Sequence, residues 1–222
     1  MWPELIVFDF DGVIADSELL ACGVAAAYAT ELGKPMSTQE GLERFMGRQV
    51  TDVRLQIEQD IGRRVPDFVD ELRRRTLNAF KSSLQPVNGA IEFLRQFETV
   101  AKCIASSSAL DRIRASLEVL GVPESVFARI FSAEEVERGK PFPDIFLHAA
   151  SSLDVGVDRV LVIEDSVGGV RAAAAAGMAV VGLVAGSHIG PKHGALLMEA
   201  GAEIVLASYR DVKAWLVENS GR

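Results

Sequence analysis

The chain has 222 residues, of which 49% are hydrophobic and 24% are charged, a composition typical of a globular protein rather than a disordered or fibrous one. Acidic residues outnumber Lys and Arg by 31 to 23, and this excess argues against a nucleic-acid-binding surface, which needs clustered positive charge. Charge or glycine interrupts every apolar run before about 18 residues, so we expect no membrane span. The chain runs into Leu5-Ile6-Val7-Phe8 without a preceding basic region, so we expect no signal peptide. With only Cys22 and Cys103, in no metal-like spacing, these features favour a cytoplasmic location.

Five short apolar runs have the length and the β-branched content of buried strands. Such continuous runs are typical of a parallel sheet that is covered on both faces. The predicted strands are residues 5–10, 100–105, 160–163, 180–184 and 204–206.

Helical patterns that end near glycines alternate with these strands. The predicted helices are residues 109–120, 143–153, 167–176 and 191–200. Alternation of this kind indicates βαβ units with right-handed crossovers. The fold class is therefore α/β, with a Rossmann-like parallel sheet as its core.

Residues 17–84 break this alternation, because they contain helix signals and no convincing strand. Ser37 and Glu40 have the spacing of a capping box, and Thr51 is expected to cap a helix that ends near Gly62. We interpret the segment as a helical cap domain of about four helices. The expected division is a catalytic core of residues 1–16 plus 85–222 and a cap of residues 17–84.

Acidic residues follow two of the predicted strands. The first strand leads into Asp9-Phe10-Asp11-Gly12-Val13, and a later one into Glu164-Asp165-Ser166. The carboxyl ends of strands in open α/β sheets are where ligands bind, so these carboxylates are expected to meet there. Burying them together requires a cation, and oxygen ligands without His or Cys favour Mg²⁺ over Zn²⁺.

Two further segments supply hydrogen-bond donors and positive charge. Ser106-Ser107-Ser108 follows the second predicted strand and leads into a helix, a position that attracts phosphate, with Ser107 or Ser108 expected to cap that helix. Lys140 lies in a turn bracketed by prolines, Gly139-Lys140-Pro141-Phe142-Pro143. Both segments are therefore candidates for binding a phosphoryl group.

In this order, the motifs resemble those of the haloacid dehalogenase superfamily, in particular its branch with a helical cap that includes β-phosphoglucomutase and sugar-phosphate phosphatases such as those for 6-phosphogluconate and phosphoglycolate. Asp9-Phe10-Asp11-Gly12-Val13 matches the first family motif and Ser106 the second. Lys140 matches the third, and Glu164-Asp165-Ser166 the fourth. The resemblance covers essentially the whole chain.

The resemblance implies a role for each motif. Asp9 is expected to attack phosphorus and form an aspartyl phosphate, while Asp11 acts as general acid and base. Ser106 and Lys140 are expected to hold the phosphoryl oxygens, with Ser107 as a further substrate-binding residue. Mg²⁺ is expected on the Asp9 carboxylate, the Asp11 backbone carbonyl, Asp165 and, directly or through water, Glu164.

Among activities of the family, phosphate-ester hydrolysis fits best. A dehalogenase needs neither a metal nor a second carboxylate, whereas Asp11 and Glu164-Asp165 are present. A β-phosphoglucomutase-like phosphotransferase is the alternative, but Ala21 and Val50 stand where such mutases carry His and Arg. A binding module without catalysis is disfavoured because the catalytic set is complete.

The expected substrate is a small phosphorylated metabolite: a sugar, polyol or short acid phosphate. The cap candidates for contacting it are Arg44, Arg48 and Gln49. No metal role is expected for His188 and His193, because they lack a third ligand. We expect a monomer, with a dimer as the alternative.

Overall fold

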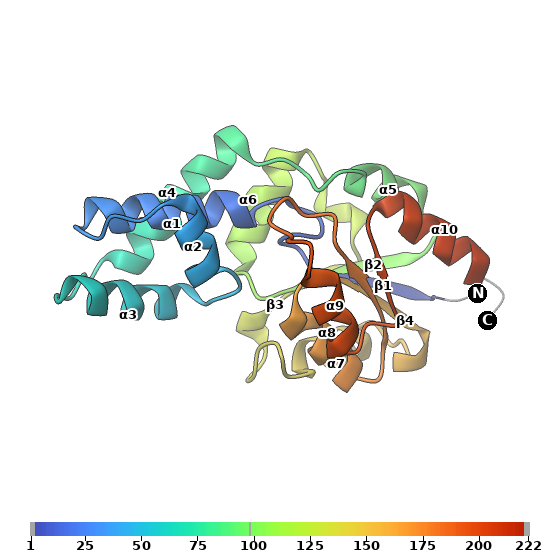
Figure 1. Cartoon of the computed structure of the whole chain (residues 1–222). Helices are drawn as coiled ribbons and strands as arrows, with labels where there is room; N and C mark the ends of the chain where they lie inside the picture. The colour runs from blue at the N-terminus through green and yellow to red at the C-terminus, as the bar shows by residue number, and fades with distance from the viewer. Residues whose placement is uncertain (1–2, 98, 220–222) are drawn as a thin grey trace. The chain divides into compact units, whose positions relative to one another are not determined.

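The computed structural model describes residues 3–97 and 99–219. The chain forms two compact units, one of Met1–Asp16 with Pro86–Arg222 and the other of Ser17–Gln85 (Figure 1). The first contains the sheet and the second is entirely helical within its described elements.

The first unit is built on a six-stranded sheet in the order β3-β2-β1-β4-β5-β6, and every neighbouring pair is parallel. β1 is central, lies between β2 and β4, and is fully buried. The predicted α/β class with a Rossmann-like parallel sheet is confirmed. The strands are β1 (Leu5–Phe8), β2 (Ala101–Ser106), β3 (Arg129–Ser132), β4 (Val160–Glu164), β5 (Ala179–Leu183) and β6 (Ile204–Leu206).

β3, which forms an edge of the sheet, was not predicted from the sequence. This strand has four residues and begins with the exposed Arg129, so it offers too short an apolar run to be recognised. The position of β3 in the sheet is set by its pairing with β2, in which Ile130 lies opposite Ile104.

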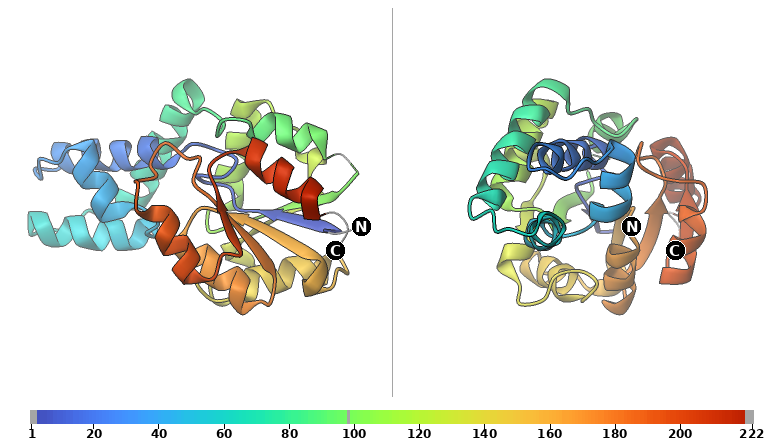
Figure 2. Two further views of the ribbon diagram at one scale, coloured as in Figure 1. Left: turned by 45° about the vertical axis from the view of Figure 1, so that its right-hand side comes forward. Right: turned by 60° about the vertical axis from the view of Figure 1, so that its left-hand side comes forward.

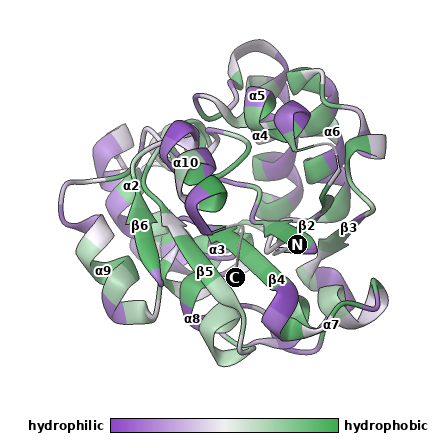
Figure 3. Ribbon diagram, turned by 90° about the vertical axis from the view of Figure 1, so that its right-hand side faces the viewer, coloured by the Kyte–Doolittle hydropathy of each residue, from purple (hydrophilic) through white to green (hydrophobic). Residues whose placement is uncertain are grey.

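Helices cover both faces of the sheet, with α5, α6 and α10 on one face and α7, α8 and α9 on the other (Figures 2 and 3). This arrangement explains the continuous apolar strands, since neither face is left to water. The helices are α5 (Ala90–Gln96), α6 (Leu110–Leu120), α7 (Asp144–Ser152), α8 (Val167–Ala175), α9 (His193–Ala200) and α10 (Tyr209–Asn219), with short 3₁₀ turns η1 (Glu124–Val126), η2 (Ala133–Glu135) and η3 (Val157–Arg159).

The second unit has its own hydrophobic core, in which the rings of Tyr28 and Phe68 stack with centroids 5.0 Å apart. The capping box of Ser37 and Glu40 is confirmed. The prediction that Thr51 caps a helix was wrong, because Gln49 is the N-cap and Thr51 lies inside the first turn. The helices are α1 (Glu18–Glu31), α2 (Thr38–Phe45), α3 (Val50–Ile61) and α4 (Phe68–Ser83).

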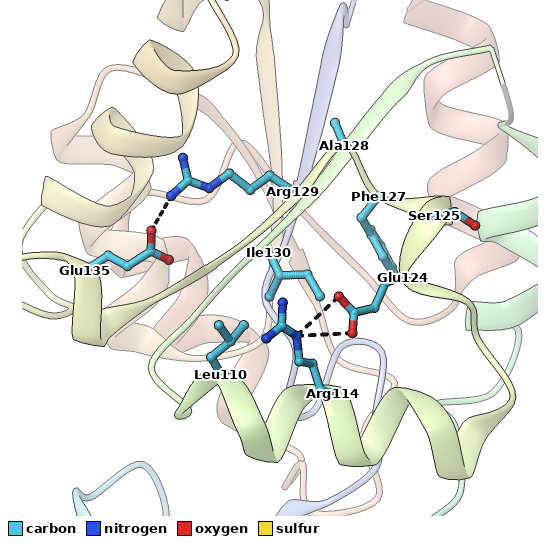
Figure 4. A pocket seen from close by; sticks show the side chains of 9 residues that line it. All are labelled: Leu110, Arg114, Glu124, Ser125, Phe127, Ala128, Arg129, Ile130 and Glu135. Atoms are coloured by element: carbon cyan, nitrogen blue, oxygen red, sulfur yellow. Dashed lines mark hydrogen bonds and ion pairs between the residues drawn. The ribbon is translucent and has the colours of Figure 1, made fainter.

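Among the residues described, no helix has the length and apolar character needed to cross a bilayer. A hollow of about 460 Å³ lies beside the edge strand β3, and Figure 4 shows its charged residues joined in two ion pairs, Arg114 with Glu124 and Arg129 with Glu135. Its lining includes none of the predicted site residues.

Candidate active site

Three carboxylates meet where β1 and β4 end. Asp9 follows β1, and its N–H donates to the carbonyl of Ile163 at 3.0 Å, which extends the pairing of the two strands. Asp9, Glu164 and Asp165 are all buried, and one oxygen of each lies within 4.8 Å of the others. Three of the four predicted acids therefore meet at the strand ends, whereas the Asp11 carboxylate contacts Arg112 and Ser108.

Lys140 reaches this cluster from the turn before α7. Its Nζ lies 2.6 Å from Asp9 Oδ1 and 2.6 Å from Glu164 Oε1, and its side chain is only 7% exposed. Burial opposes the charged form of Lys140, but the two carboxylates outweigh burial, and the pKa of the ammonium is raised on balance. Lys140 therefore carries a positive charge at neutral pH and fixes the orientation of both carboxylates.

The cluster carries more negative charge than Lys140 can neutralise. Burial, helped by Glu164 and Asp165 and opposed by Lys140, raises the pKa of Asp9 well above its ordinary range. Lys140 contacts Asp9 and Glu164, so the cluster gathers three carboxyl groups around the one ammonium that Lys140 supplies. A divalent cation with a preference for oxygen ligands fits this donor set, and Mg²⁺ is such a cation.

We expect the stability that Asp9 contributes to the metal-free protein to fall as the pH rises from about 4 towards neutrality. The folded state keeps a proton on Asp9 to higher pH than the unfolded state, whose carboxyl ionises near 3.8. Urea unfolding of wild type and Asp9→Asn in EDTA isolates this group from the other carboxyls. Wild type should lose stability relative to Asp9→Asn with rising pH, and a difference that does not change with pH would contradict the expectation.

Glu164 is held on both of its oxygens. Lys140 binds Oε1, while the N–H and Oγ of Ser166 donate to Oε2 at 2.7 and 3.0 Å. Ser166 is also the N-cap of α8, since its Oγ accepts from the N–H of Gly169 at 3.0 Å. Glu164 is therefore fixed between Lys140 on one oxygen and Ser166 on the other.

Because Gly169 has no side chain, the Glu164 carboxylate can pack against its backbone. A Cβ at Gly169 would lie 1.5 Å from Glu164 Oε1, whereas one at Gly168 would meet nothing within 4 Å.

We expect Gly169→Ala to lower the unfolding free energy by about 1–3 kcal/mol and to reduce activity by displacing Glu164. Gly168→Ala is the matched control and should stabilise the helix by about 0.5–1 kcal/mol. Equal effects of the two substitutions in urea unfolding and activity assays would contradict this account.

The side chain of Asp11 faces the start of α6. Arg112 donates to Asp11 Oδ1 at 2.7 Å, and Ser108 Oγ donates to Oδ2 at 2.5 Å. The expected helix cap by Ser107 or Ser108 was wrong, because the N-cap is Ala109. Arg112, which lies in the first turn of α6, had been given no role.

The two remaining serines have different environments. Ser106 ends β2 beside the central strand, is buried, and its Oγ accepts from the N–H of Ser108 at 3.1 Å. Ser107 is exposed. Ser108 therefore contacts both residues: its N–H binds the hydroxyl of Ser106, and its own hydroxyl binds Asp11.

Two histidines contact Asp165, and neither was predicted to have a role in the site. His188 Nε2 lies 3.1 Å from Asp165 Oδ2, and His193 Nε2 lies 2.5 Å from the Asp165 carbonyl oxygen. Both histidines come from the segment that follows β5, the neighbour of β4.

The predicted cap residues belong to the unit of Ser17–Gln85. Arg44 pairs with Asp60 at 2.6 Å within that unit. Arg48 and Gln49 are exposed, and Gln49 is the residue before α3.

Comparison with known proteins decides the family of the chain. A family model described as haloacid dehalogenase-like hydrolase matches residues 6–183. The chain belongs to this family. As a haloacid dehalogenase-like hydrolase it carries the four predicted motif elements, of which Asp9, Lys140 and Glu164 are in direct contact.

Individual relatives agree with this assignment. The chain is 26% identical over 191 residues to a 6-phosphogluconate phosphatase of Escherichia coli, covering 85% of this chain and 86% of that protein. It is 30% identical over 210 residues to a phosphorylated carbohydrates phosphatase of Thermotoga maritima, covering 90% and 92%. The crystal structure of a haloacid dehalogenase family hydrolase of Deinococcus radiodurans, with bound phosphate and sodium, matches with a TM-score of 0.81 and 33% identity over 98% of this chain and 97% of that one. The predicted family and enzyme class, a phosphatase, are confirmed.

Proposed function

We propose that this haloacid dehalogenase-like phosphatase is a Mg²⁺-dependent hydrolase of small phosphate monoesters that uses Asp9 as a covalent nucleophile. The observation that carries the proposal is the buried Asp9 carboxylate at the end of the central strand, held at Oδ1 by Lys140 beside Glu164 and Asp165. A nucleophile fixed in this way can attack a phosphoryl group without first reorganising its surroundings.

Catalysis proceeds in two displacements. An Asp9 oxygen forms a bond to phosphorus while the bond to the ester oxygen breaks, and Asp11 gives that oxygen its proton. Water then attacks the aspartyl phosphate, Asp11 takes up its proton, and inorganic phosphate leaves with Asp9 restored. Ser106 and Lys140 hold the phosphoryl oxygens through both steps, since such transfers depend mainly on positioning and charge.

The metal site uses the acids that the structure brings together. The Asp9 and Asp165 carboxylates and the Asp11 backbone carbonyl would hold Mg²⁺, with Glu164 taking part directly or through water. When bound, Mg²⁺ supplies positive charge to the phosphoryl oxygens. Arg112 and Ser108 hold the Asp11 side chain in place.

The substrate class is a phosphorylated sugar, polyol or short acid. Two relatives named above act on 6-phosphogluconate and on phosphorylated carbohydrates, which supports this class. We assign residues 17–84 as a cap domain that sets specificity, with Arg48, Gln49 and Ser107 as candidate contacts. Arg44 must exchange its ion pair with Asp60 to take part. The protein is proposed to act in the cytoplasm, as a monomer.

Phosphate release from a panel of sugar, polyol and acid phosphates, with Mg²⁺ and with EDTA, tests this function. Release that requires Mg²⁺ and ranks the panel is the expected result. No release from any ester would overturn the hydrolase assignment and favour the β-phosphoglucomutase-like alternative, which hexose 1-phosphate isomerisation then tests. Release that EDTA leaves unchanged would overturn the metal requirement.

A further inference from the structure

The segment of residues 184–193, here called the histidine loop, follows β5 and leads into α9. It delivers His188 to the side chain of Asp165 and His193 to its backbone, as described above. The Asp165 carbonyl oxygen can only accept, so Nε2 of His193 carries a proton. The same tautomer of His188 would let its Nε2 donate to the Asp165 carboxylate. The His188 side chain is 4% exposed, so this contact is shielded from water.

Two glycines, Gly12 and Gly186, leave room for the contact between His188 and Asp165. Gly12 has a φ of 79°, and a Cβ there would lie 1.9 Å from Asp165 Oδ2 and 2.8 Å from His188 Cε1. A Cβ at Gly186 would lie 2.7 Å from the same His188 carbon. Any side chain at either position would push His188 or Asp165 aside, so the backbone is shaped around the pair.

The histidine loop is also tied to the segment that follows Asp9. The N–H and Oγ of Ser187 donate to Asp16 Oδ1 at 3.0 and 2.9 Å. From α10, the hydroxyl of Tyr209 donates to the carbonyl of Val13 at 2.9 Å. Burial raises the pKa of Tyr209, which keeps this hydroxyl protonated. The histidine loop therefore contacts both Asp165 and the segment of residues 9–16, and Tyr209 binds that segment as well.

We propose that His188 is a positioning residue for the metal ligand Asp165, and that His193 fixes the backbone of the same residue. This inference rests on the proposed function, because it concerns the Mg²⁺ site assigned there. A carboxylate beside two other carboxylates is repelled by them and tends to rotate away. The contact of His188 Nε2 with Asp165 Oδ2 opposes this rotation and keeps the carboxylate directed at the other acids of the site.

Such outer contacts to a metal ligand typically change metal affinity or activity by about 10–100-fold when they are removed. We therefore expect His188→Leu to weaken Mg²⁺ binding by about 10–100-fold, with a much smaller change in kcat at saturating Mg²⁺. His188→Gln keeps an N–H donor at a similar reach and should recover most of the affinity. His193→Leu should weaken binding less, because its contact is to the backbone of Asp165.

Isothermal titration calorimetry of Mg²⁺ into the full chain measures this affinity without any substrate. His148→Leu is the control, because His148 lies on α7 against Phe131 and Glu135 and contacts none of the acids of the site. Wild-type affinity in folded His188→Leu would overturn the inference alone. Absence of Mg²⁺ binding in wild type would overturn the proposed metal requirement as well.

A measurement on the wild-type protein tests the same inference even if a His188 variant fails to fold. Long-range ¹H–¹⁵N NMR of the histidine rings reports which nitrogen carries the proton. We expect Nε2 protonation for His188 and His193, and a shift of the His188 signals when Mg²⁺ is added. A His188 ring protonated only on Nδ1, or unaffected by Mg²⁺ that binds, would overturn the inference.

Discussion

Replacing Asp9 with asparagine is expected to reduce phosphate release by on the order of 10⁴-fold or more, as removal of other catalytic nucleophiles does. The amide keeps the size of the side chain but cannot form the acyl phosphate. Initial rates with saturating substrate and Mg²⁺ measure the effect. Asp158→Asn, an exposed position in the same unit, is the matched control and should leave the rate unchanged.

The same substitution is expected to make the metal-free protein more stable at neutral pH. Burial and two neighbouring carboxylates oppose ionisation of Asp9, so removing its charge relieves the cluster. An inactive but more stable variant separates a catalytic role from a structural one. Activity of Asp9→Asn close to that of wild type would contradict the nucleophile assignment.

Replacing Lys140 with methionine is also expected to reduce activity strongly. Unlike Asp9→Asn, it should lower the stability of the metal-free protein. The substitution leaves Asp9 and Glu164 buried without the ammonium that binds both. Removing one partner of a buried ion pair typically costs about 3–5 kcal/mol, and we expect the metal-free protein to lose unfolding free energy of this order. Activity should fall by about 10²–10³-fold, the loss typical when one group that stabilises transition-state charge is removed.

Urea unfolding in EDTA and rate measurements with Mg²⁺ test the Lys140 prediction. Lys213→Met, at an exposed position on α10, is the control for loss of one lysine and should change neither quantity. Because Mg²⁺ also neutralises the carboxylates, it should restore part of the stability lost by Lys140→Met. Stability equal to wild type in EDTA would show that Lys140 does not compensate the cluster.

The sheet and the central acids could be predicted because local patterns determine them. An apolar run such as β1 must be buried, and parallel strands bring their carboxyl ends to one edge. Asp9 and Glu164 follow β1 and end β4, respectively, so their meeting depends only on strand order. Lys140 was singled out by its proline-bracketed turn and by its match to a family motif, but no local pattern links it to strands far away in the sequence.

The parts that could not be predicted depend on tertiary contacts. β3 is defined by its pairing with β2 rather than by its own composition. Ser107 or Ser108 was expected to cap α6, but the N-cap of this helix is Ala109, and the Ser108 hydroxyl donates to the Asp11 carboxylate. His188 lies 23 residues from Asp165 in sequence, and only the adjacency of β4 and β5 brings them together.

Trapping the covalent intermediate tests the central claim most directly. The full chain is mixed with a substrate from the panel and Mg²⁺, quenched in acid during turnover, and reduced with borohydride, which converts an aspartyl phosphate to homoserine. Peptide mass spectrometry is expected to find homoserine at position 9 in wild type and not in Asp9→Asn. Steady phosphate release with unmodified Asp9, or with the modification on another residue, would contradict the account.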